Sequence, residues 1–408
     1  MNLRKKLLLF GMVIGTCLTS GCWDKKELND IALVSAIGLD KSEEGDLMGS
    51  FQIINPGNVA GALQGGGSGD KPPVTVFTST GNNVLELDRV ASSKLSRFMY
   101  LQHANLLVIS EELAKEEGII SLLDAFDRST NFRSTSKIVI ALDVQAKDII
   151  ETLTSIDKVS ADKVIKTLKS TEHELGESVS VDIQELIKNL VSSGREPVIG
   201  GFTIKKNDEN KKKIEITSAT TNPSSPKTSG VAIFKKGKLV DWMDAEKVRG
   251  MLWASNKIQM ASLDIDWEDT KDAIDYQAIR QQTNLKVKMK NGKPKMFIKV
   301  RTEGNLQEVK VPLNLNETTV LTEIESELAK EIKKQMKAAI ATAKENKADI
   351  FGFGDIVHQN EPKEWKKLKD DWHDVTFPTM EVDIQVKAFI RRTGLRNKPF
   401  ITDLKNDK

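Results

Sequence analysis

The alternation of apolar and polar residues predicts strands and helices in turn along the first half of the chain. Two β-rich runs, Ile31 to Leu39 and Leu47 to Ile54, flank a turn at Ser42 to Gly45 and predict a hairpin. Further strands are predicted at Val74 to Thr80, Leu106 to Ile109 and Lys137 to Leu142. The spacing of apolar residues predicts helices over 84–98, 111–126, 146–153 and most of 155–192.

The second half changes to shorter strands. They are predicted at Ile199 to Lys205, Lys213 to Ala219 and Val231 to Phe234, followed by a helix from Ala245 to about Asn256. Further on, Asn291-Gly292 lies between two alternating runs, 285–290 and 296–300. An Asn-Gly pair in that position is typical of a tight β-hairpin.

A long amphipathic helix dominates the last section. Its apolar face consists of Leu321, Ile324, Leu328, Ile332, Met336 and Ile340, while Glu and Lys cover the other face. A shorter helix carries Trp365, Leu368 and Trp372, which we interpret first as core residues and second as a partner surface. The alternation from Val382 to Ile390 predicts a half-buried strand.

These elements predict an α+β fold of about three domains, with mixed sheets flanked by helices. We place an N-terminal α/β domain at 22–195, a strand-rich middle domain at 196–262, and a C-terminal α+β domain that contains the long helix at 263–396. A Gly-rich loop at Gly65 to Gly69 interrupts the first domain, and residues 397–408 form a polar tail.

Residues 1–21 read as a bacterial secretory signal peptide. A basic start, Arg4 to Lys6, precedes an apolar stretch of about a dozen residues, which is too short to span a bilayer as a stable helix. The stretch ends in Leu18-Thr19-Ser20-Gly21-Cys22, which looks like a lipobox, although Thr19 stands where such boxes usually carry Leu. Cleavage between Gly21 and Cys22 would make Cys22 the first mature residue.

A lipidated Cys22 would carry a diacylglyceryl group on its thiol and an acyl chain such as palmitate on its amine. Two or three such chains anchor a protein stably in a membrane. The alternative is a signal peptide cut near Ser20-Gly21 with an ordinary thiol behind it, and the rival Cys17, preceded by Thr16, fits the pattern worse. The mature chain would hold one cysteine, so no intramolecular disulfide could stabilise it.

Composition narrows the classes of function. The 408 residues include 60 Lys+Arg and 58 Asp+Glu, a balance too even for a protein whose main task is to hold nucleic acid. We therefore expect no nucleic-acid partner. Four histidines and two cysteines leave little material for catalysis, and the motifs present fit no cofactor or metal, so we expect a non-enzymatic protein without a cofactor.

The candidate motifs fail on specific positions. The Gly-rich loop lacks the Lys-Ser/Thr end of a phosphate-binding loop, and His173-Glu174 lacks the second His of a zinc-protease helix. The acidic run Asp264 to Asp269 lacks the turn glycine of a calcium loop. The pair His358 and His373 has no Cys or fixed carboxylate partner, so we interpret both as surface histidines. Phe351 to Asp355 reads as a tight turn whose phenylalanines fill the core.

Four ordered blocks of sequence carry a family resemblance. They are Gly21-Cys22-Trp23-Asp24-Lys25-Lys26-Glu27-Leu28-Asn29-Asp30; Gln102-His103-Ala104-Asn105-Leu106-Leu107-Val108-Ile109-Ser110; Gly230-Val231-Ala232-Ile233-Phe234 with Arg249-Gly250-Met251-Leu252-Trp253; and Ala348-Asp349-Ile350-Phe351-Gly352-Phe353-Gly354, continuing to Trp365 and Leu395. Over nearly its whole length the chain resembles the C subunits of GerA-type spore germinant receptors of endospore-forming Gram-positive bacteria, the Ger(x)C lipoproteins.

The resemblance implies a three-domain lipoprotein on the outer face of the spore inner membrane. It would assemble with membrane-embedded A and B subunits into a receptor that senses nutrients and triggers germination. The family has no known catalytic residue, so the only site that the resemblance transfers is the lipidated Cys22. The alternative function is a lipid-anchored protein that binds a small ligand of its own, for which a concave pocket with convergent polar groups would be the discriminating feature.

Overall fold

The computed structural model describes residues 30–60, 72–205 and 225–393, together with positions 3, 27 and 215. The predicted cleavage site at Gly21-Cys22, the glycine loop and the polar tail therefore lie outside the described residues. The same holds for the predicted signal peptide and the strand at 213–219, apart from Leu3 and Glu215.

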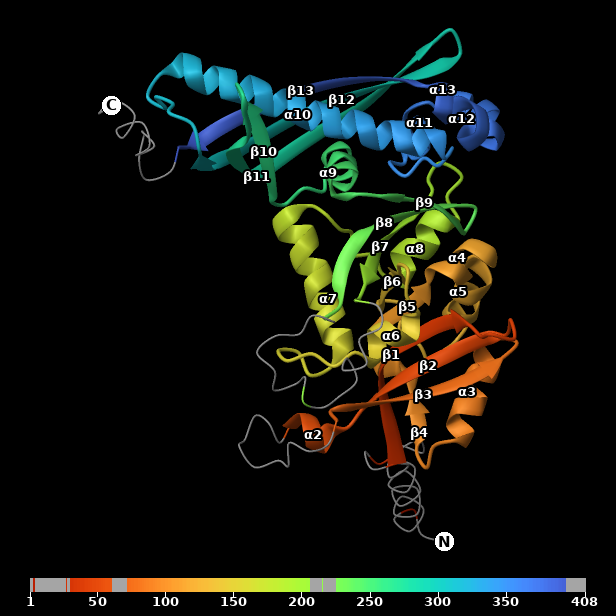
Figure 1. The fold of residues 1–408 in the computed structure, drawn as a ribbon. Coiled ribbons are helices and arrows are strands. Elements are labelled where there is room, and N and C mark those ends of the chain that lie inside the picture. Colours follow the sequence, from red (N-terminus) through yellow and green to blue (C-terminus); the bar gives the residue numbers. More distant parts are fainter. Residues whose placement is uncertain are drawn as a thin grey trace.

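The first half of the chain builds a nine-stranded mixed sheet (Figure 1). Its strands are β1 Ile31–Lys41, β2 Leu47–Ile54, β3 Val74–Gly81, β4 Phe98–Tyr100, β5 Leu106–Ser110, β6 Lys137–Ala141, β7 Val198–Thr203, β8 Lys227–Lys235 and β9 Lys238–Met243. The order is β3-β2-β1-β5-β6-β7-β8-β9, and β4 pairs with the start of β1. The predicted β1–β2 hairpin is confirmed: the two strands are antiparallel, whereas β1, β5, β6 and β7 run parallel.

Helices cover both faces of this sheet. One set comprises α3 Val84–Ser93, α4 Glu111–Glu116, α5 Ile120–Asp127 and α8 Ile183–Leu190, and the other α6 Ala146–Glu151 and α7 Ser160–Ser170. Strand β5 shows why both faces need cover, because Leu107 and Ile109 enter one hydrophobic cluster while Leu106 and Val108 enter the other. Gly118, with a positive φ of 82°, separates α4 from α5.

The second sheet has four strands in the order β10-β11-β12-β13. They are β10 Ala261–Trp267, β11 Thr270–Lys290, β12 Lys293–Val309 and β13 Glu381–Arg392, and α10 Thr318–Glu345 packs on one face. Asn291 and Gly292 both have positive φ, as a two-residue hairpin turn requires. The hairpin is much longer than predicted, because its outer positions are almost all polar and bulges shift the alternation near Ala278.

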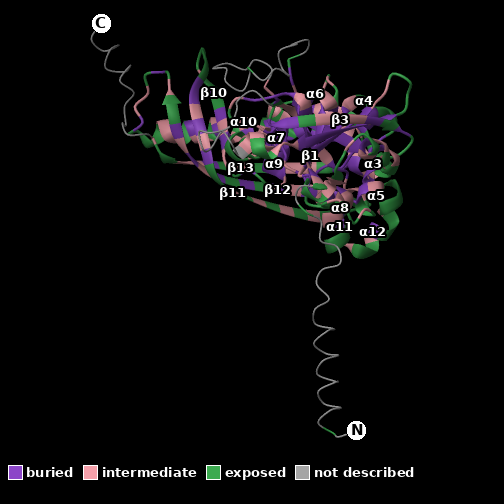
Figure 2. Cartoon of the chain, turned by 90° about the horizontal axis from the view of Figure 1, so that it is seen from below, coloured by how far each residue is buried: buried purple, intermediate pink, exposed green. Residues whose placement is uncertain are grey.

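Shorter helices fill the remaining parts. They are α2 Pro56–Ala60, α9 Ala245–Ala254, α11 Phe353–Asn360, α12 Pro362–Leu368 and α13 Phe377–Thr379, with 3₁₀ or π turns at 101–103, 171–175, 369–371 and 372–376. Helix α9 lies against α10 at Gly250, where an added Cβ would sit 2.1 Å from the carbonyl oxygen of Gln335. The two helices meet there backbone to backbone, and Figure 2 shows buried residues continuing through this region.

Mixed sheets covered by helices confirm the predicted α+β class. The predicted domain limits stay predictions. The first limit, at residue 195, falls within the hydrogen-bonded nine-stranded sheet, since β7, β8 and β9 continue the sheet that β1 to β6 begin. The second limit, at residue 262, lies at the start of β10, where the second sheet begins.

Candidate functional site

A fully buried carboxylate, Asp349, organises the loop between α10 and α11. Its Oδ1 accepts hydrogen bonds from the main-chain N–H groups of residues 351–353, at 2.9 to 3.2 Å. Its Oδ2 accepts one from the Gly354 N–H at 2.8 Å and one from the Trp372 indole at 2.9 Å. Five donors therefore satisfy a side chain that water does not reach.

The local sequence explains why the loop adopts this form. Gly352 has a φ of +73°, a conformation that side chains other than glycine rarely adopt. That turn directs the free N–H groups at the start of α11 toward Asp349, and a negative charge is favourable at a helix N-terminus. The prediction that Phe351 and Phe353 fill the core is confirmed, since both are buried and their rings stack with centroids 4.9 Å apart.

Burial raises the pKa of Asp349 to about 6, while the hydrogen bonds from Gly354 and Trp372 and the nearby Arg195 act in the opposite direction. Because all five hydrogen bonds are donated to the carboxylate oxygens, they favour the ionised form of the side chain. A buried carboxylate of this kind stabilises the fold only while its donors stay in place, because an unpaired charge would be costly there.

The segment between α8 and β7 closes over this loop. Ser192 Oγ donates to Asp355 Oδ1 at 2.7 Å, and Arg195 Nε donates to Asp355 Oδ2 at 3.1 Å. Arg195 also donates to the Phe351 carbonyl at 3.3 Å, and the Glu196 N–H donates to the Asp349 carbonyl at 2.9 Å. We call residues 192–196 together with 349–355 the clamp.

Close packing leaves no room for larger side chains in the clamp. An added Cβ on Gly194 would lie 2.5 Å from the Asp355 nitrogen, and one on Gly354 would lie 2.6 Å from the Gly194 Cα. The clamp therefore joins the segment that leads into the first sheet to the loop that follows α10, which packs on the second sheet.

Two further titratable groups border the clamp. His373 Nδ1 accepts a hydrogen bond from the Asp349 N–H at 3.3 Å, and burial lowers the His373 pKa to about 4, so the ring is neutral at pH 7. Both carboxylate oxygens of Glu196 accept the Lys236 N–H, each at 3.1 Å, and burial raises the Glu196 pKa to about 7.

The interpretation of His373 as a surface residue is thus wrong: its ring is half-buried and faces the Asp349 loop. His358 is exposed, as predicted, and stacks on Trp365 with centroids 5.8 Å apart. Trp365 and Trp372 are buried and meet edge to face at 5.2 Å, which confirms them as core residues. Throughout the part of the chain that the structure describes, no three His, Cys, Asp or Glu side chains gather in a way that could hold a metal ion.

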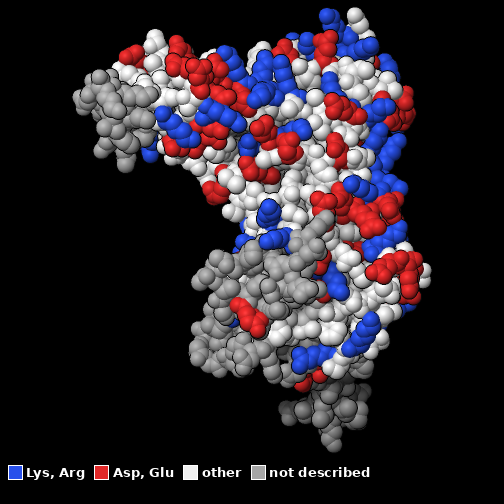
Figure 3. All heavy atoms as spheres, in the orientation of Figure 1, with Lys and Arg blue, Asp and Glu red and all other residues white. Residues whose placement is uncertain are grey.

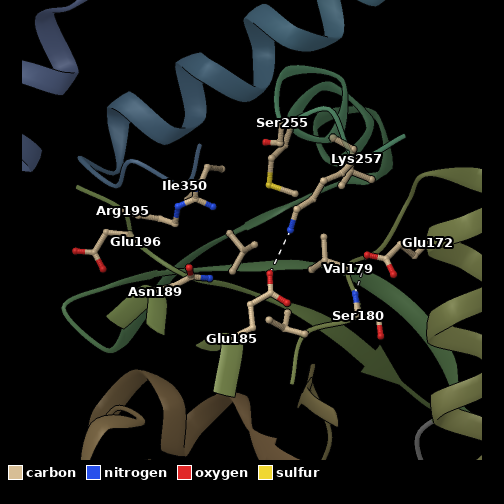
Figure 4. A pocket seen from close by; sticks show the side chains of 14 residues that line it. Glu172, Val179, Ser180, Glu185, Asn189, Arg195, Glu196, Ser255, Lys257 and Ile350 are labelled. Atoms are coloured by element: carbon tan, nitrogen blue, oxygen red, sulfur yellow. Dashed lines mark hydrogen bonds and ion pairs between the residues drawn. The ribbon is translucent and has the colours of Figure 1, made fainter. Parts of the chain in front are cut away.

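A polar cleft lies beside the clamp and is one of the concave features that a ligand-binding function could use (Figure 4). Its lining residues come from 172–181, α8, Arg195–Glu196 and the end of α9. Lys257 Nζ lies 3.3 Å from Glu185 Oε1 across the cleft, and Glu172 accepts the Ser180 N–H at 3.1 Å. Lys257 and Glu185 thus neutralise each other, and Glu172 is bonded to the main chain of its own wall, so the arrangement favours a joint over a ligand site.

Sequence reasoning did not single out Ser192, Arg195 or Glu196, and it included Asp355 only as the last residue of a predicted turn. A usable signal existed at Asp349, which is a polar residue between apolar ones and directly precedes a Phe-Gly-Phe-Gly run. Residues 192–196, by contrast, lie about 150 residues away from this loop in the chain, and local spacing carries no trace of their contacts with it.

Comparisons with known proteins cover nearly all of the chain. The family model described as "Spore germination protein N-terminal domain" matches residues 24–204, and the model "Spore germination B3/ GerAC like, C-terminal" matches 229–394. Spore germination protein KC of Bacillus subtilis (strain 168) is 43% identical, covering 99% of this chain and 100% of that protein. Spore germination protein A3 of the same organism is 24% identical, covering 96% and 99%.

A solved structure shares the fold. The crystal structure of the GerBC protein matches with a TM-score of 0.56 at 18% identity, covering 87% of this chain and 96% of that one. Within the described residues, none of the helices is both long enough and apolar enough to cross a membrane.

Proposed function

The chain belongs to the Ger(x)C family of germinant receptor C subunits, and from this premise we propose that it works as a lipid-anchored, non-enzymatic assembly subunit. In this proposal Cys22 carries the lipid, and the chain lies on the outer face of the spore inner membrane. There it assembles with the A and B membrane subunits and helps to transmit the germination signal.

The observation that carries the proposal is the clamp. Ion pairs and hydrogen bonds from residues 192–196 to 349–355 join the two sheets at a point where backbone meets backbone. A joint of this kind fixes how surfaces on both sheets are presented, which is what an assembly subunit needs and a ligand-binding hinge does not. In the adjoining cleft Lys257 pairs with Glu185, Arg195 pairs with Asp355, and Glu172 and Glu196 are bonded to main-chain N–H groups, so these side chains already have partners within the chain and do not favour the small-ligand alternative.

The anchor is tested by exchanging one cysteine at a time. Cys22→Ala should abolish metabolic acyl labelling and release the chain from spore membranes. The matched control is Cys17→Ala, which lies in the segment that cleavage removes and should change neither readout. Acyl-labelled, membrane-bound Cys22→Ala protein would exclude Cys22 as the anchor.

Assembly is tested in the same spores. A tagged chain should recover the A and B subunits from solubilised membranes, and the clamp variant Arg195→Ala should recover less of both. Lys166→Ala is the control, because Lys166 forms an exposed ion pair with Asp157 away from the clamp. Equal recovery with a clamp variant that is demonstrably loosened would mean that the joint is not needed for assembly.

A further inference from the structure

The outer face of the second sheet, opposite α10, carries an unusual concentration of positive charge. From the Arg280–Glu303 pair to the free end of the β11–β12 hairpin, the register of β11, β12 and β13 places ten basic residues on this face and three acidic ones. The basic residues are Arg280, Lys286, Lys288, Lys290, Lys293, Lys295, Lys299, Arg301, Lys387 and Arg391, and the acidic ones are Glu303, Glu381 and Asp383. This part of the face therefore carries an excess of seven positive charges, whereas Asp275 and Glu308 lie opposite each other near its other end.

The excess is concentrated at the free end of the β11–β12 hairpin. Lys286, Lys288, Lys290, Lys293, Lys295 and Lys299 lie there, and we call this group the basic hairpin. Figure 1 shows the hairpin extending beyond the rest of the sheet, and Figure 3 shows Lys and Arg gathered at that end. At the other end of the sheet, Asp264 pairs with Asp275, so charge changes sign along the sheet.

The strand register makes this concentration costly for the fold. Lys288 lies directly opposite Lys295, and Lys290 directly opposite Lys293, and like charges in cross-strand pairs destabilise a sheet. An ion pair with Glu381 offsets the charge of Lys295, whose Nζ lies 2.9 Å from Glu381 Oε2. The Lys288 ammonium lies 5.7 Å from the centroid of the Phe297 ring. Among the described residues, the other lysines of the basic hairpin form no salt bridge. An external anion would offset the repulsion that remains.

The shape and chemistry of the face favour one kind of anion. The charges of the basic hairpin are all lysines, which are flexible point charges, and its residues line none of the described pockets. Clusters of four to eight Lys/Arg near a membrane surface are attracted to anionic lipid headgroups by about 1 kcal/mol each. A bilayer bearing phosphate headgroups matches a diffuse positive surface of this kind.

The start of β1 and the free end of the basic hairpin lie at opposite ends of the molecule (Figure 1), so the proposed anchor brings both to one bilayer when the long axis of the molecule lies along the membrane. Eight residues separate Cys22 from Ile31, the first residue of β1, and the nine steps from Cys22 to Ile31 span at most about 30 Å when fully extended. A tether of that length gives the chain a high effective concentration at the membrane surface. The attraction then acts over a Debye length of about 8–10 Å once the hairpin approaches the headgroups.

We propose that the basic hairpin is a second, electrostatic contact with the membrane and binds the anionic lipid headgroups of the bilayer that holds the anchor. This inference rests on the proposed anchoring at Cys22. With the acidic end of the sheet directed away from the bilayer, the contact would select one orientation of the tethered chain.

The test uses the full lipidated chain, purified from membranes and reconstituted into vesicles. Asn284→Cys places a fluorophore on the basic hairpin face, and Ile156→Cys, at an 87% exposed position between α6 and α7, places one elsewhere. Energy transfer to a headgroup-labelled lipid is compared between vesicles of phosphatidylcholine alone and vesicles that contain phosphatidylglycerol. Transfer from position 284 should rise about twofold with the anionic lipid and fall back in about 0.5 M salt, whereas transfer from position 156 should not follow lipid charge.

Charge variants make the test specific. Lys288→Glu with Lys290→Glu should remove the dependence on anionic lipid, and the matched pair Lys334→Glu with Lys337→Glu on α10 should leave it intact. Equal transfer in the two kinds of vesicle would overturn the proposal. So would a loss of A and B subunit recovery in the 288/290 variant with unchanged transfer, because the face would then bind an acidic protein surface.

The parent chain separates a failure of this inference from a failure of the anchor. If Cys22 is lipidated and the signal peptide removed, the parent has no free thiol and takes up no maleimide fluorophore. Labelling of the parent, or its failure to float with neutral vesicles, would count against the anchor. An unlabelled, floating parent combined with charge-independent transfer would count against the basic hairpin alone.

Discussion

Replacing Asp349 with asparagine changes one atom of the clamp and tests its central claim. The asparagine carbonyl can replace Oδ1 and still accept from residues 351–353. Its NH₂ group, however, stands where Oδ2 accepts from the Gly354 N–H and the Trp372 indole. Those two donors would then face a third donor in a site that excludes water.

The size of the effect follows from these contacts. A buried donor that loses its partner costs about 1–3 kcal/mol, and the two bonds that are lost had a charged acceptor. Breaking one side of a buried charged network typically costs about 3–5 kcal/mol. We therefore expect Asp349→Asn to lower the free energy of unfolding by about 3–5 kcal/mol at pH 7.

Thermal unfolding of the purified chain measures this loss of stability. Combining Asp349→Asn with Trp372→Phe gives a double-mutant cycle that tests the pairing of the two residues. The phenylalanine removes one of the two stranded donors, so the double variant should be more stable than the sum of the single losses predicts, by about 1–2 kcal/mol. An unchanged melting temperature for Asp349→Asn would refute the assignment of Asp349 as a buried acceptor. Strict additivity in the cycle would refute its pairing with Trp372.

Three further changes probe the same region. Trp365→Ala should cost about 3–5 kcal/mol in a melting experiment, because Trp365 is buried against Trp372, and an unmoved melting temperature with reduced A and B recovery would mark it as a partner contact instead. Glu196 has a folded pKa of about 7 against an ordinary 4.5, so its contribution to stability is full below pH 4.5 and is lost as the pH rises through 7. Unfolding curves of Glu196→Gln, measured across this pH range, should no longer show that decline in stability. If the stability of the variant fell with pH as steeply as that of the parent, the raised pKa of Glu196 would be contradicted. Gly250→Ala should lower the melting temperature because its Cβ would meet the carbonyl of Gln335, and a neutral result would show that α9 and α10 separate easily.

Elements with a strong local pattern were predictable from sequence. The β1–β2 hairpin, the helix α10 and the turn at Asn291-Gly292 each depend on a period or on a turn chemistry that neighbouring residues display by themselves. The misses have equally physical causes. In β10 the outward Asp264 and Asp266 alternate with buried Leu263 and Ile265. We tested this acidic run only as a calcium-binding loop, so the strand was not predicted.

The full length of β11 and β12 was not predicted for a related reason. Only one face of this hairpin is covered, so the outer positions are free to be lysine, glutamine or asparagine, and the apolar half of the pattern is partly interrupted by threonine and by bulges. Helix α11 was missed because it begins inside a glycine-containing run that, taken alone, indicates a turn. Asp349 supplies the missing acceptors for its first N–H groups.

The block of sequence at 348–354, which carries much of the family resemblance, can now be understood as the clamp itself. The aspartate is needed because several N–H groups converge where water is absent, and Gly352 is needed because the turn has a positive φ. Gly354 is needed because Gly194 and Trp372 leave no space for a Cβ. None of these requirements concerns a substrate, and each concerns how two distant segments fit together. These requirements agree with the proposed assembly role, in which the clamp holds the two segments in one fixed arrangement.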